Sequence, residues 1–140
     1  MSDKRIHIIV CTPERVVYER DIKEVYVPTK AGVTGILPKH VGLVSVLDKG
    51  ALHIKHDEGE EILSIYKGVL EVRPESNVVV LADSADHISE MSEEAIEQAK
   101  ARVEQAMKEE EGRDAFAYAR FEDMLLREIS RINIARKYRK

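Results

Sequence analysis

The chain has little of the chemistry that marks disulfide-bonded, metal-binding or membrane-spanning proteins. Its 140 residues include one cysteine, Cys11, which excludes an internal disulfide and a site built from cysteine thiolates alone. No apolar run approaches the roughly 20 residues that a helix needs to cross a bilayer. The start does not resemble a secretory signal, because its apolar run is short and an acidic residue follows closely. We expect a soluble chain from a reducing compartment, with Cys11 as a small buried strand residue.

Motifs that carry catalysis are missing as well. There is no GxSxG turn and no glycine-rich phosphate loop. His53 and His56 are three residues apart, which in a strand puts them on opposite faces. Neither the HExxH motif nor the His–Cys spacing of a metal site occurs around the five histidines, which are His7, His40, His53, His56 and His87. We therefore expect no catalytic site, no metal and no cofactor in this chain.

The overall charge also excludes a class of partner. The formal net charge is -4 and the isoelectric point is about 5.8, which disfavours a track for nucleic-acid phosphates. Hydrophobic residues make up 44% of the chain, as in a globular protein, while 34% are charged, which favours exposed helical surface.

Residues 1–86 are rich in short β-type runs separated by turn residues. The pair Lys67-Gly68 and the acids Asp83 and Asp86 are interpreted as turn formers. Many short strands without a helical pattern between them predict an antiparallel β-sandwich or flattened barrel. The predicted strands are Ile6–Cys11, Val16–Glu19, Ile22–Pro28, Val33–Leu37, Leu43–Leu47, Ala51–Lys55, Glu61–Tyr66, Val69–Arg73 and Val78–Leu81.

The composition changes abruptly after residue 86, and residues 87–140 are predicted to form an antiparallel helical hairpin. Ser92 is expected to cap the first helix, Gly112 to end it and Asp114 to cap the second. The alanine-rich stripe of the first helix buries little area, so the hairpin needs a partner surface. Apolar residues at helical spacing are Ile96, Ala99, Val103 and Ala106, then Phe121, Leu125, Ile129 and Ile132.

Basic residues crowd the C-terminal end of the second helix, among them Arg127, Arg131, Arg136 and Lys137. One explanation is that they match the helix dipole and form a solvated face. The other is that they dock on an acidic partner protein. The two explanations are compatible.

The stretch TGILPKH, residues 34–40, places a histidine two residues after a proline. That histidine could be a catalytic base, a metal ligand, a contact residue or part of a turn, and the stretch alone does not decide. Together with two later runs, however, it resembles the epsilon subunit of F-type ATP synthases. The matching residues are Gly35, Leu37, Pro38, His40 and Leu43, then Gly68, Leu70, Glu71 and Val72, then Leu81, Ala82 and Asp83.

The resemblance implies a non-catalytic subunit of the central stalk, which couples the membrane rotor ring to the catalytic head during proton-driven ATP synthesis. The sandwich would sit beside the gamma subunit and on the polar loops of the ring's c subunits. The hairpin would lie folded on the sandwich, or extend along gamma into the head of alpha and beta subunits and restrain ATP hydrolysis. Membrane association would then come only through the complex. The expected place is the cytoplasmic face of a bacterial plasma membrane, or the stromal face of a thylakoid.

The resemblance also implies roles for particular residues. Pro38, His40 and Gly42 would lie in a loop that contacts the rotor ring, although the family usually has proline where Gly42 stands. A turn histidine without a partner is the alternative for His40. The basic residues that would meet an acidic loop of the beta subunits are Arg127, Arg131, Arg136 and Lys137.

Some relatives bind ATP through an Ile/Leu-Asp-x-x-Arg-Ala motif that opens the first helix. Ser92 and Ala95 stand here in place of the aspartate and the arginine. A phosphate would meet Glu93 and Glu94 without a matched cation, which predicts weak or absent nucleotide binding. The alternative to a rotor subunit is a free-standing β-sandwich adaptor with a coiled-coil hairpin, which the proteins that co-purify with the chain would distinguish.

Overall fold

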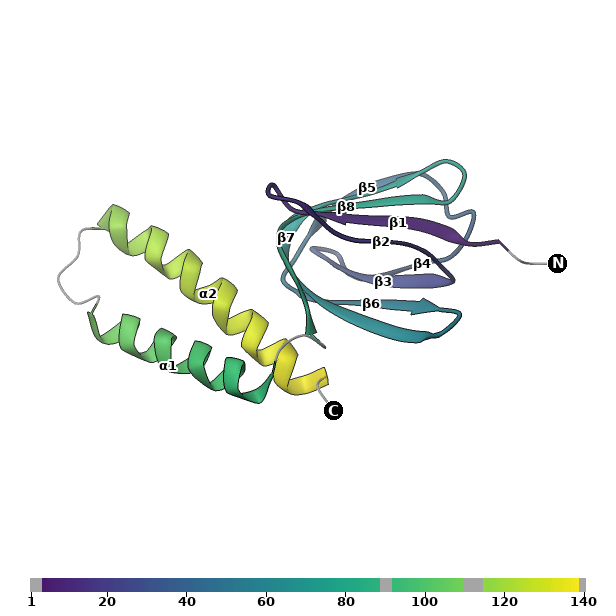
Figure 1. The fold of residues 1–140 in the computed structure, drawn as a ribbon. Coiled ribbons are helices and arrows are strands. Elements are labelled where there is room, and N and C mark those ends of the chain that lie inside the picture. The colour runs from purple at the N-terminus through teal and green to yellow at the C-terminus, as the bar shows by residue number, and fades with distance from the viewer. Residues whose placement is uncertain (1–3, 89–91, 110–114, 139–140) are drawn as a thin grey trace.

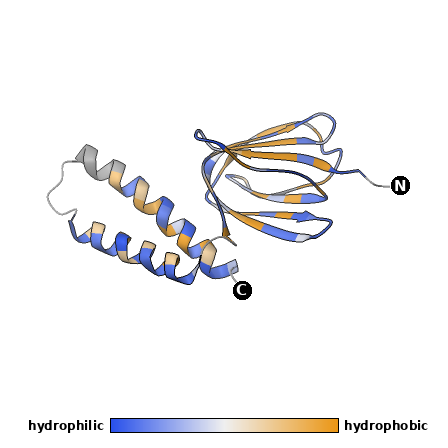
Figure 2. Ribbon diagram, in the orientation of Figure 1, coloured by the Kyte–Doolittle hydropathy of each residue, from blue (hydrophilic) through white to orange (hydrophobic). Residues whose placement is uncertain are grey.

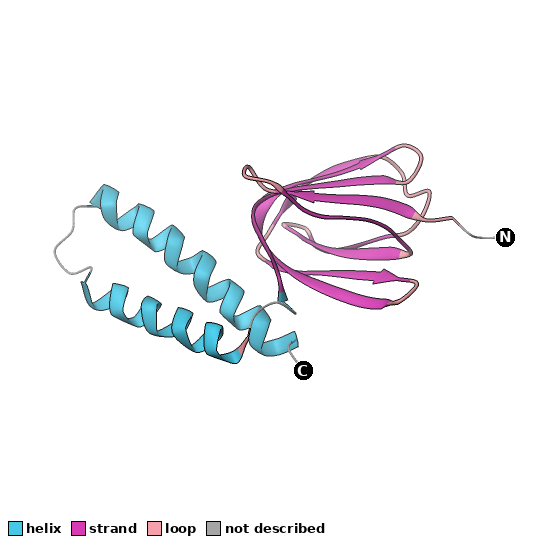
Figure 3. Cartoon of the chain, in the orientation of Figure 1, coloured by secondary structure: helices cyan, strands magenta, loops and turns pink. Residues whose placement is uncertain are grey.

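The computed structural model describes residues 4–88, 92–109 and 115–138, with side chains outside 115–120. An N-terminal β-sandwich is followed by two helices, as predicted (Figures 1 and 3). Gly112 and Asp114, the predicted helix break and cap, lie outside the described residues. The elements are β1 (Ile6–Cys11), β2 (Val16–Ile22), β3 (Glu24–Thr29), β4 (Gly32–Ile36), β5 (Leu43–Leu47), β6 (Gly50–His56), β7 (Gly59–Arg73), β8 (Asn77–His87), α1 (Glu93–Glu109) and α2 (Ala115–Tyr138).

The strands form two layers that share the long strand β7. Its residues 59–65 pair with β6 and its residues 68–72 pair with β5. One layer has the order β2-β1-β8-β7-β5, and the other brings β4, β3 and β6 together with the first half of β7. The pairing is antiparallel with one exception, because β1 and β8 run parallel. These are the first and last strands of the sandwich, so no hairpin turn fixes their relative direction.

The predicted turn at Lys67-Gly68 is wrong, because both residues belong to β7. The strand passes from one layer to the other there, with φ values of 58° at Lys67 and 134° at Gly68. A Cβ atom on Gly68 would lie 2.0 Å from the carbonyl oxygen of Leu81. Glycine is therefore required by the close approach of β8, and the described residues form eight strands where the sequence predicted nine.

The predicted turn role of Asp83 and Asp86 is wrong too, since β8 continues to His87. Asp86 stays in register opposite Ser64 of β7 and meets Arg131 of α2 on its outer side. An acid can stay within a strand when it lies on the outer face. Cys11 lies in β1 as expected, but it is only partly buried because it also points to the outer face.

The core between the two layers is made by alternate residues of the strands. In β1, Ile6, Ile8 and Val10 are fully buried while the intervening residues face outward. Figure 2 shows the apolar colouring concentrated on the strands and more broken up along the helices. Ile65 and Leu70, on the two halves of β7, both belong to this core. The crossing strand thus joins both layers to one interior.

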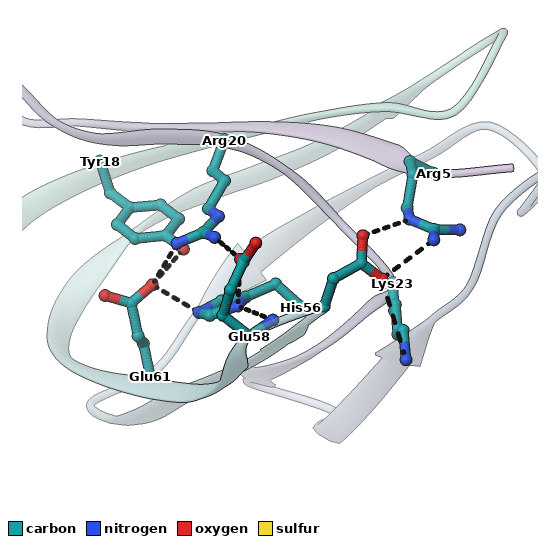
Figure 4. A network of polar contacts seen from close by, with 8 residues as sticks. Arg5, Tyr18, Arg20, Lys23, His56, Glu58 and Glu61 are labelled. Atoms are coloured by element: carbon teal, nitrogen blue, oxygen red, sulfur yellow. Dashed lines mark hydrogen bonds and ion pairs between the residues drawn. The ribbon is translucent and has the colours of Figure 1, made fainter. Parts of the chain in front are cut away.

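Polar side chains bridge the seam between β2 and the β6–β7 hairpin (Figure 4), beside a backbone hydrogen bond from the Lys23 N–H to the Lys55 carbonyl oxygen at 2.8 Å. The Tyr18 hydroxyl donates a hydrogen bond to Glu61 Oε2 at 2.5 Å. Burial is the larger cause and this hydrogen bond the second cause of the raised pKa of Tyr18. His56 is buried, whereas His53 is only partly buried. The Nδ1 atom of His56 accepts a hydrogen bond from the Glu58 N–H at 3.1 Å, and its Nε2 lies 3.1 Å from Glu61 Oε2. His53 and His56 therefore face opposite sides, which confirms the prediction from their spacing.

The helical hairpin has a capped first helix and packs against the sandwich. The hydroxyl of Ser92 accepts a hydrogen bond from the Ala95 N–H at 3.1 Å, so the predicted cap is confirmed. The apolar stripe predicted for the second helix is wrong at Ile129, which is 36% exposed. The buried face of α2 instead includes Ile132, Ile134 and Ala135. The cluster that joins α1, α2 and the sandwich contains Ile88, Ile96, Ala99, Val103, Ile132, Ile134 and Ala135, against Ala51 and Ile62 of β6 and β7.

Candidate functional site

The outer face of the layer β2-β1-β8-β7-β5 carries a continuous row of apolar side chains. Strand register places one such residue from each strand side by side across the layer. Val46 is 56% exposed, Leu81 48% and Val69 39%. Contiguous exposed apolar side chains mark surfaces that partners cover. The members, called here the apolar row, are Val16, Cys11, Leu81, Val69 and Val46.

Charged side chains border the apolar row toward the N-terminal end of β1. His7 lies between two acids of β2, with Nδ1 2.8 Å from Asp21 Oδ1 and Nε2 2.8 Å from Glu19 Oε2. On β7, Arg73 donates two hydrogen bonds to Glu71, of 2.9 and 3.2 Å, and these lower the pKa of Glu71. The face is thus apolar along one row and charged beside it.

The loop between β4 and β5 contains all three residues that the resemblance assigned to the rotor ring. Pro38 and Lys39 form a turn in which the His40 N–H donates to the Leu37 carbonyl at 3.1 Å. Lys39 has a φ of 68°, and its N–H donates to the Ser76 hydroxyl at 2.8 Å, which ties this loop to the β7–β8 turn. A left-handed residue held by a neighbouring turn gives the loop a defined shape.

The surface of that loop is partly apolar. Leu37 is 54% exposed and Val41 is 76% exposed, on either side of the half-buried His40. The His40 Nδ1 lies 2.8 Å from the Val41 carbonyl oxygen, so the ring is held against its own loop. Gly42 is exposed, and a Cβ there would meet only the Val72 carbonyl oxygen, at 3.7 Å. The absence of proline at Gly42 therefore leaves open space and not a packing defect.

α2 is fastened to the sandwich at Asp123, about two turns from its start, and at its C-terminal end. Asp123 accepts hydrogen bonds from Lys67 Nζ at 3.2 Å and from the Tyr66 hydroxyl at 3.1 Å, and the Lys67 contact lowers the pKa of Asp123. At the other end, the ring of Tyr138 meets that of His53 edge-on, with centroids 4.8 Å apart. Because β7 crosses between the layers at Lys67, the Lys67 side chain points toward α2 and reaches Asp123.

The four basic residues predicted to contact the beta subunits do not form one free patch. Arg131 Nη1 lies 3.6 Å from Asp86 and its other amino group bonds to Glu128, which leaves it 26% exposed. Arg136 donates to Glu97 of α1 at 3.1 Å. The charge of Arg127 helps to lower the pKa of Asp123, and the Lys137 ammonium lies 5.3 Å from the centroid of the Tyr138 ring. In this posture two of the four hold the hairpin together and against the sandwich.

Both the sandwich and the hairpin have counterparts in known proteins. A family model described as "ATP synthase, Delta/Epsilon chain, beta-sandwich domain" matches residues 5–88. The ATP synthase epsilon chain of Halalkalibacterium halodurans is 34% identical over 93% of this chain and 96% of its own length. The chain belongs to the ATP synthase epsilon chain family. The epsilon chain of Herpetosiphon aurantiacus is 35% identical over 94% of each chain.

Solved structures share the fold of this family member. A chain of the Euglena gracilis mitochondrial ATP synthase superposes with a TM-score of 0.70 at 16% identity, covering 98% of this chain and 82% of that one. Membership makes the chain a non-catalytic subunit of an enzyme complex, and it does not fit the alternative of a free-standing adaptor. Neither described helix is long and apolar enough to span a membrane.

A cavity of about 340 Å³ lies where α1 and α2 meet β8 and the β1–β2 turn. Its position matters because its wall includes Ala95, one of the two residues that depart from the ATP-binding motif expected from the resemblance to some relatives. Glu93 and Glu94, which the sequence suggested a phosphate would meet, do not line it. Sequence reasoning did not bring the cavity's three arginines together, because they come from segments that are far apart in the chain. The lining residues are Arg15, Asp86, His87, Ala95, Gln98, Arg102 and Arg131.

Proposed function

We propose that the chain is a rotor subunit of the central stalk, which docks on the gamma subunit through the apolar row. The observation that carries this proposal is the difference between the two outer faces of the sandwich. α2 covers the face formed by β6 and the first half of β7. The opposite face exposes Val46, Val69 and Leu81 in register across its strands. A partner on that face would remove them from water without displacing the hairpin.

The loop of residues 37–42 is proposed to contact the polar loops of the membrane rotor ring. It lies at the end of the sandwich that carries the N-terminus, away from the hairpin (Figure 1). Exposed Leu37 and Val41 supply apolar contact, and Pro38, His40 and Gly42 set its backbone. Membrane association then comes only through the complex, at the cytoplasmic face of a bacterial plasma membrane, as the bacterial relatives favour.

The hairpin is proposed to act as a brake on ATP hydrolysis. In the posture described, Arg131 and Arg136 are engaged by Asp86 and Glu97. A move of the hairpin into the head of alpha and beta subunits exchanges these acids for acids of the beta subunit. Exposed ion pairs contribute only about 0–1 kcal/mol each, so the exchange is nearly balanced. A near balance is what lets a two-state element respond to its surroundings.

Hydrolysis assays with a matched alpha–beta–gamma complex test the whole proposal. We expect the full chain and a version ending at Ile88 to bind equally, because the sandwich has its own core, but only the full chain to slow hydrolysis. A full-length variant with Arg127, Arg131, Arg136 and Lys137 all changed to glutamine keeps the hairpin without its charge. We expect it to bind and to inhibit less. If the full chain binds but does not inhibit, the proposed inhibitory role of the hairpin is wrong. If neither version binds, the proposed docking on gamma is wrong.

ATP is expected to bind weakly or not at all to the isolated chain. The Ser92 hydroxyl is occupied as the helix cap, and Asp86 presents a carboxylate to the cavity while engaging Arg131. Calorimetric titration should show no binding tighter than roughly millimolar, which corresponds to about -4 kcal/mol. Micromolar binding that Arg102→Gln abolishes would contradict this, because the cavity's arginines would then replace the missing motif.

A further inference from the structure

The cluster of His7, Glu19 and Asp21 is built around a charged imidazole. Each ring nitrogen of His7 lies 2.8 Å from a carboxylate oxygen, one of Asp21 and one of Glu19. Ionised carboxylates only accept hydrogen bonds, and a neutral imidazole has a single N–H to donate. Both contacts can be hydrogen bonds only when the imidazole is protonated. The cluster is then one cation between two anions.

The surroundings leave this proton free to exchange. The hydrogen bonds that His7 donates, first to Asp21 and then to Glu19, raise the pKa of His7, while its slight burial acts in the opposite direction. The His7 side chain is 41% exposed, and those of Glu19 and Asp21 are 49% and 71% exposed. A histidine so placed keeps its proton to a higher pH than a free imidazole does.

The other charged groups near the cluster face neighbours of their own. The side chains of Lys4 and Lys39 lie beside each other, which lowers the pKa of Lys4. On β7, Arg73 is bonded to Glu71, and on β8 the residue in the same row as His7 is the neutral Asn77. Arg5, near the start of β1, bonds to Asp57 across the seam. Within residues 4–88, His7 is thus the one cation that meets Glu19 and Asp21.

The cluster also lies on the docking face itself. His7 and Cys11 are alternate outward residues of β1, with Ile9 between them in the same column. Alternate residues on one face of a strand are roughly 7 Å apart. The acids therefore lie within about two such steps of the apolar row, close enough for one partner surface to cover both.

We propose that this face takes a partner surface in which an apolar ridge is bordered by a lysine or arginine, and that this basic side chain competes with the His7 proton for Glu19 and Asp21. The partner is the gamma subunit, so the inference rests on the proposed function. Docking then releases a proton. By linkage, the affinity rises with pH while His7 loses its proton and levels off once His7 is neutral.

The test measures the dissociation constant of the full chain for the gamma subunit between about pH 5.5 and 9 at constant ionic strength, where one released proton allows at most roughly a tenfold change per pH unit. We expect it to fall several-fold as pH rises. His7→Gln should bind tightly at every pH, while Glu19→Gln with Asp21→Asn should bind weakly at high pH. Glu60→Gln, on the other layer, should titrate like the unaltered chain, and NMR should show a lower His7 pKa in the complex.

The outcomes separate the two proposals. A flat profile, or the same profile in His7→Gln, would overturn this inference and leave docking on gamma intact. A profile that rises toward acid pH would overturn it as well, because the partner would then favour the protonated cluster. Failure of the unaltered chain to bind gamma at any pH would overturn the proposed function and this inference with it.

Discussion

Gly68→Ala is expected to lower the free energy of unfolding by about 3–5 kcal/mol, one of the largest effects of any single substitution in this chain. The new Cβ would lie 2.0 Å from the Leu81 carbonyl oxygen and 2.8 Å from the Ala82 Cα. Both are backbone atoms of β8, which is paired along most of its length and cannot withdraw. The φ of 134° adds strain that any residue with a side chain would bear.

Gly59→Ala is the matched control for this prediction. Gly59 also has a positive φ, of 141°, but nothing lies within 4 Å of its Cβ position. It should lose only about 1–2 kcal/mol, from backbone strain alone. Denaturant unfolding of the two variants measures the difference. Equal losses would mean that the close approach of β7 and β8 is not what requires glycine at Gly68.

This position also shows where local sequence reasoning fails. A lysine-glycine pair with positive φ has the same appearance in a tight turn and at a strand that crosses between layers. Only pairing decides, because Lys67 and Gly68 are framed by β6 on one side and β5 on the other. Asp83 and Asp86 were misread for a similar reason. The outward position of an acid in a strand is set by partners that lie far along the chain, such as Arg131.

Features with local causes were predicted well. Alternation of apolar and polar residues located the strands, because that period fixes which side faces the core. Ser92 was recognised as a cap from its place before a helical run, and its hydroxyl does accept the Ala95 N–H. The split between sandwich and hairpin followed from composition. Helix propensity and capping act within a few residues, so the sequence carries them directly.

The candidate docking face could not be predicted in this way. Each member of the apolar row stands in a different strand, where a single outward valine or leucine is unremarkable. The row exists because of register, including the parallel pairing of β1 with β8 that places Cys11 beside Leu81. His7 likewise gains its meaning from Glu19 and Asp21 on the neighbouring strand. Sequence resemblance suggested the partner, and the register of the strands supplies the exposed surface on which we propose that it docks.

Val69→Asp and Leu81→Asp, made singly, are each expected to weaken binding to gamma by roughly a hundredfold or more, because a residue at the centre of an interface typically contributes about 2–4 kcal/mol. Both side chains are exposed in the free chain, at 39% and 48%, so the fold should tolerate a carboxylate there. In the complex the same carboxylate would be buried without a partner. Calorimetry or surface binding with purified gamma measures the loss.

Val33→Asp is the matched control, because Val33 is 74% exposed in β4, which belongs to the other layer. It should bind gamma as the unaltered chain does, and circular dichroism should show all three variants folded. Unchanged binding by both Val69→Asp and Leu81→Asp would exclude the apolar row as the docking surface. Loss of binding in these two alone would also remove inhibition by the full chain. In the proposed function, the hairpin acts on the catalytic head only while the sandwich holds it beside gamma.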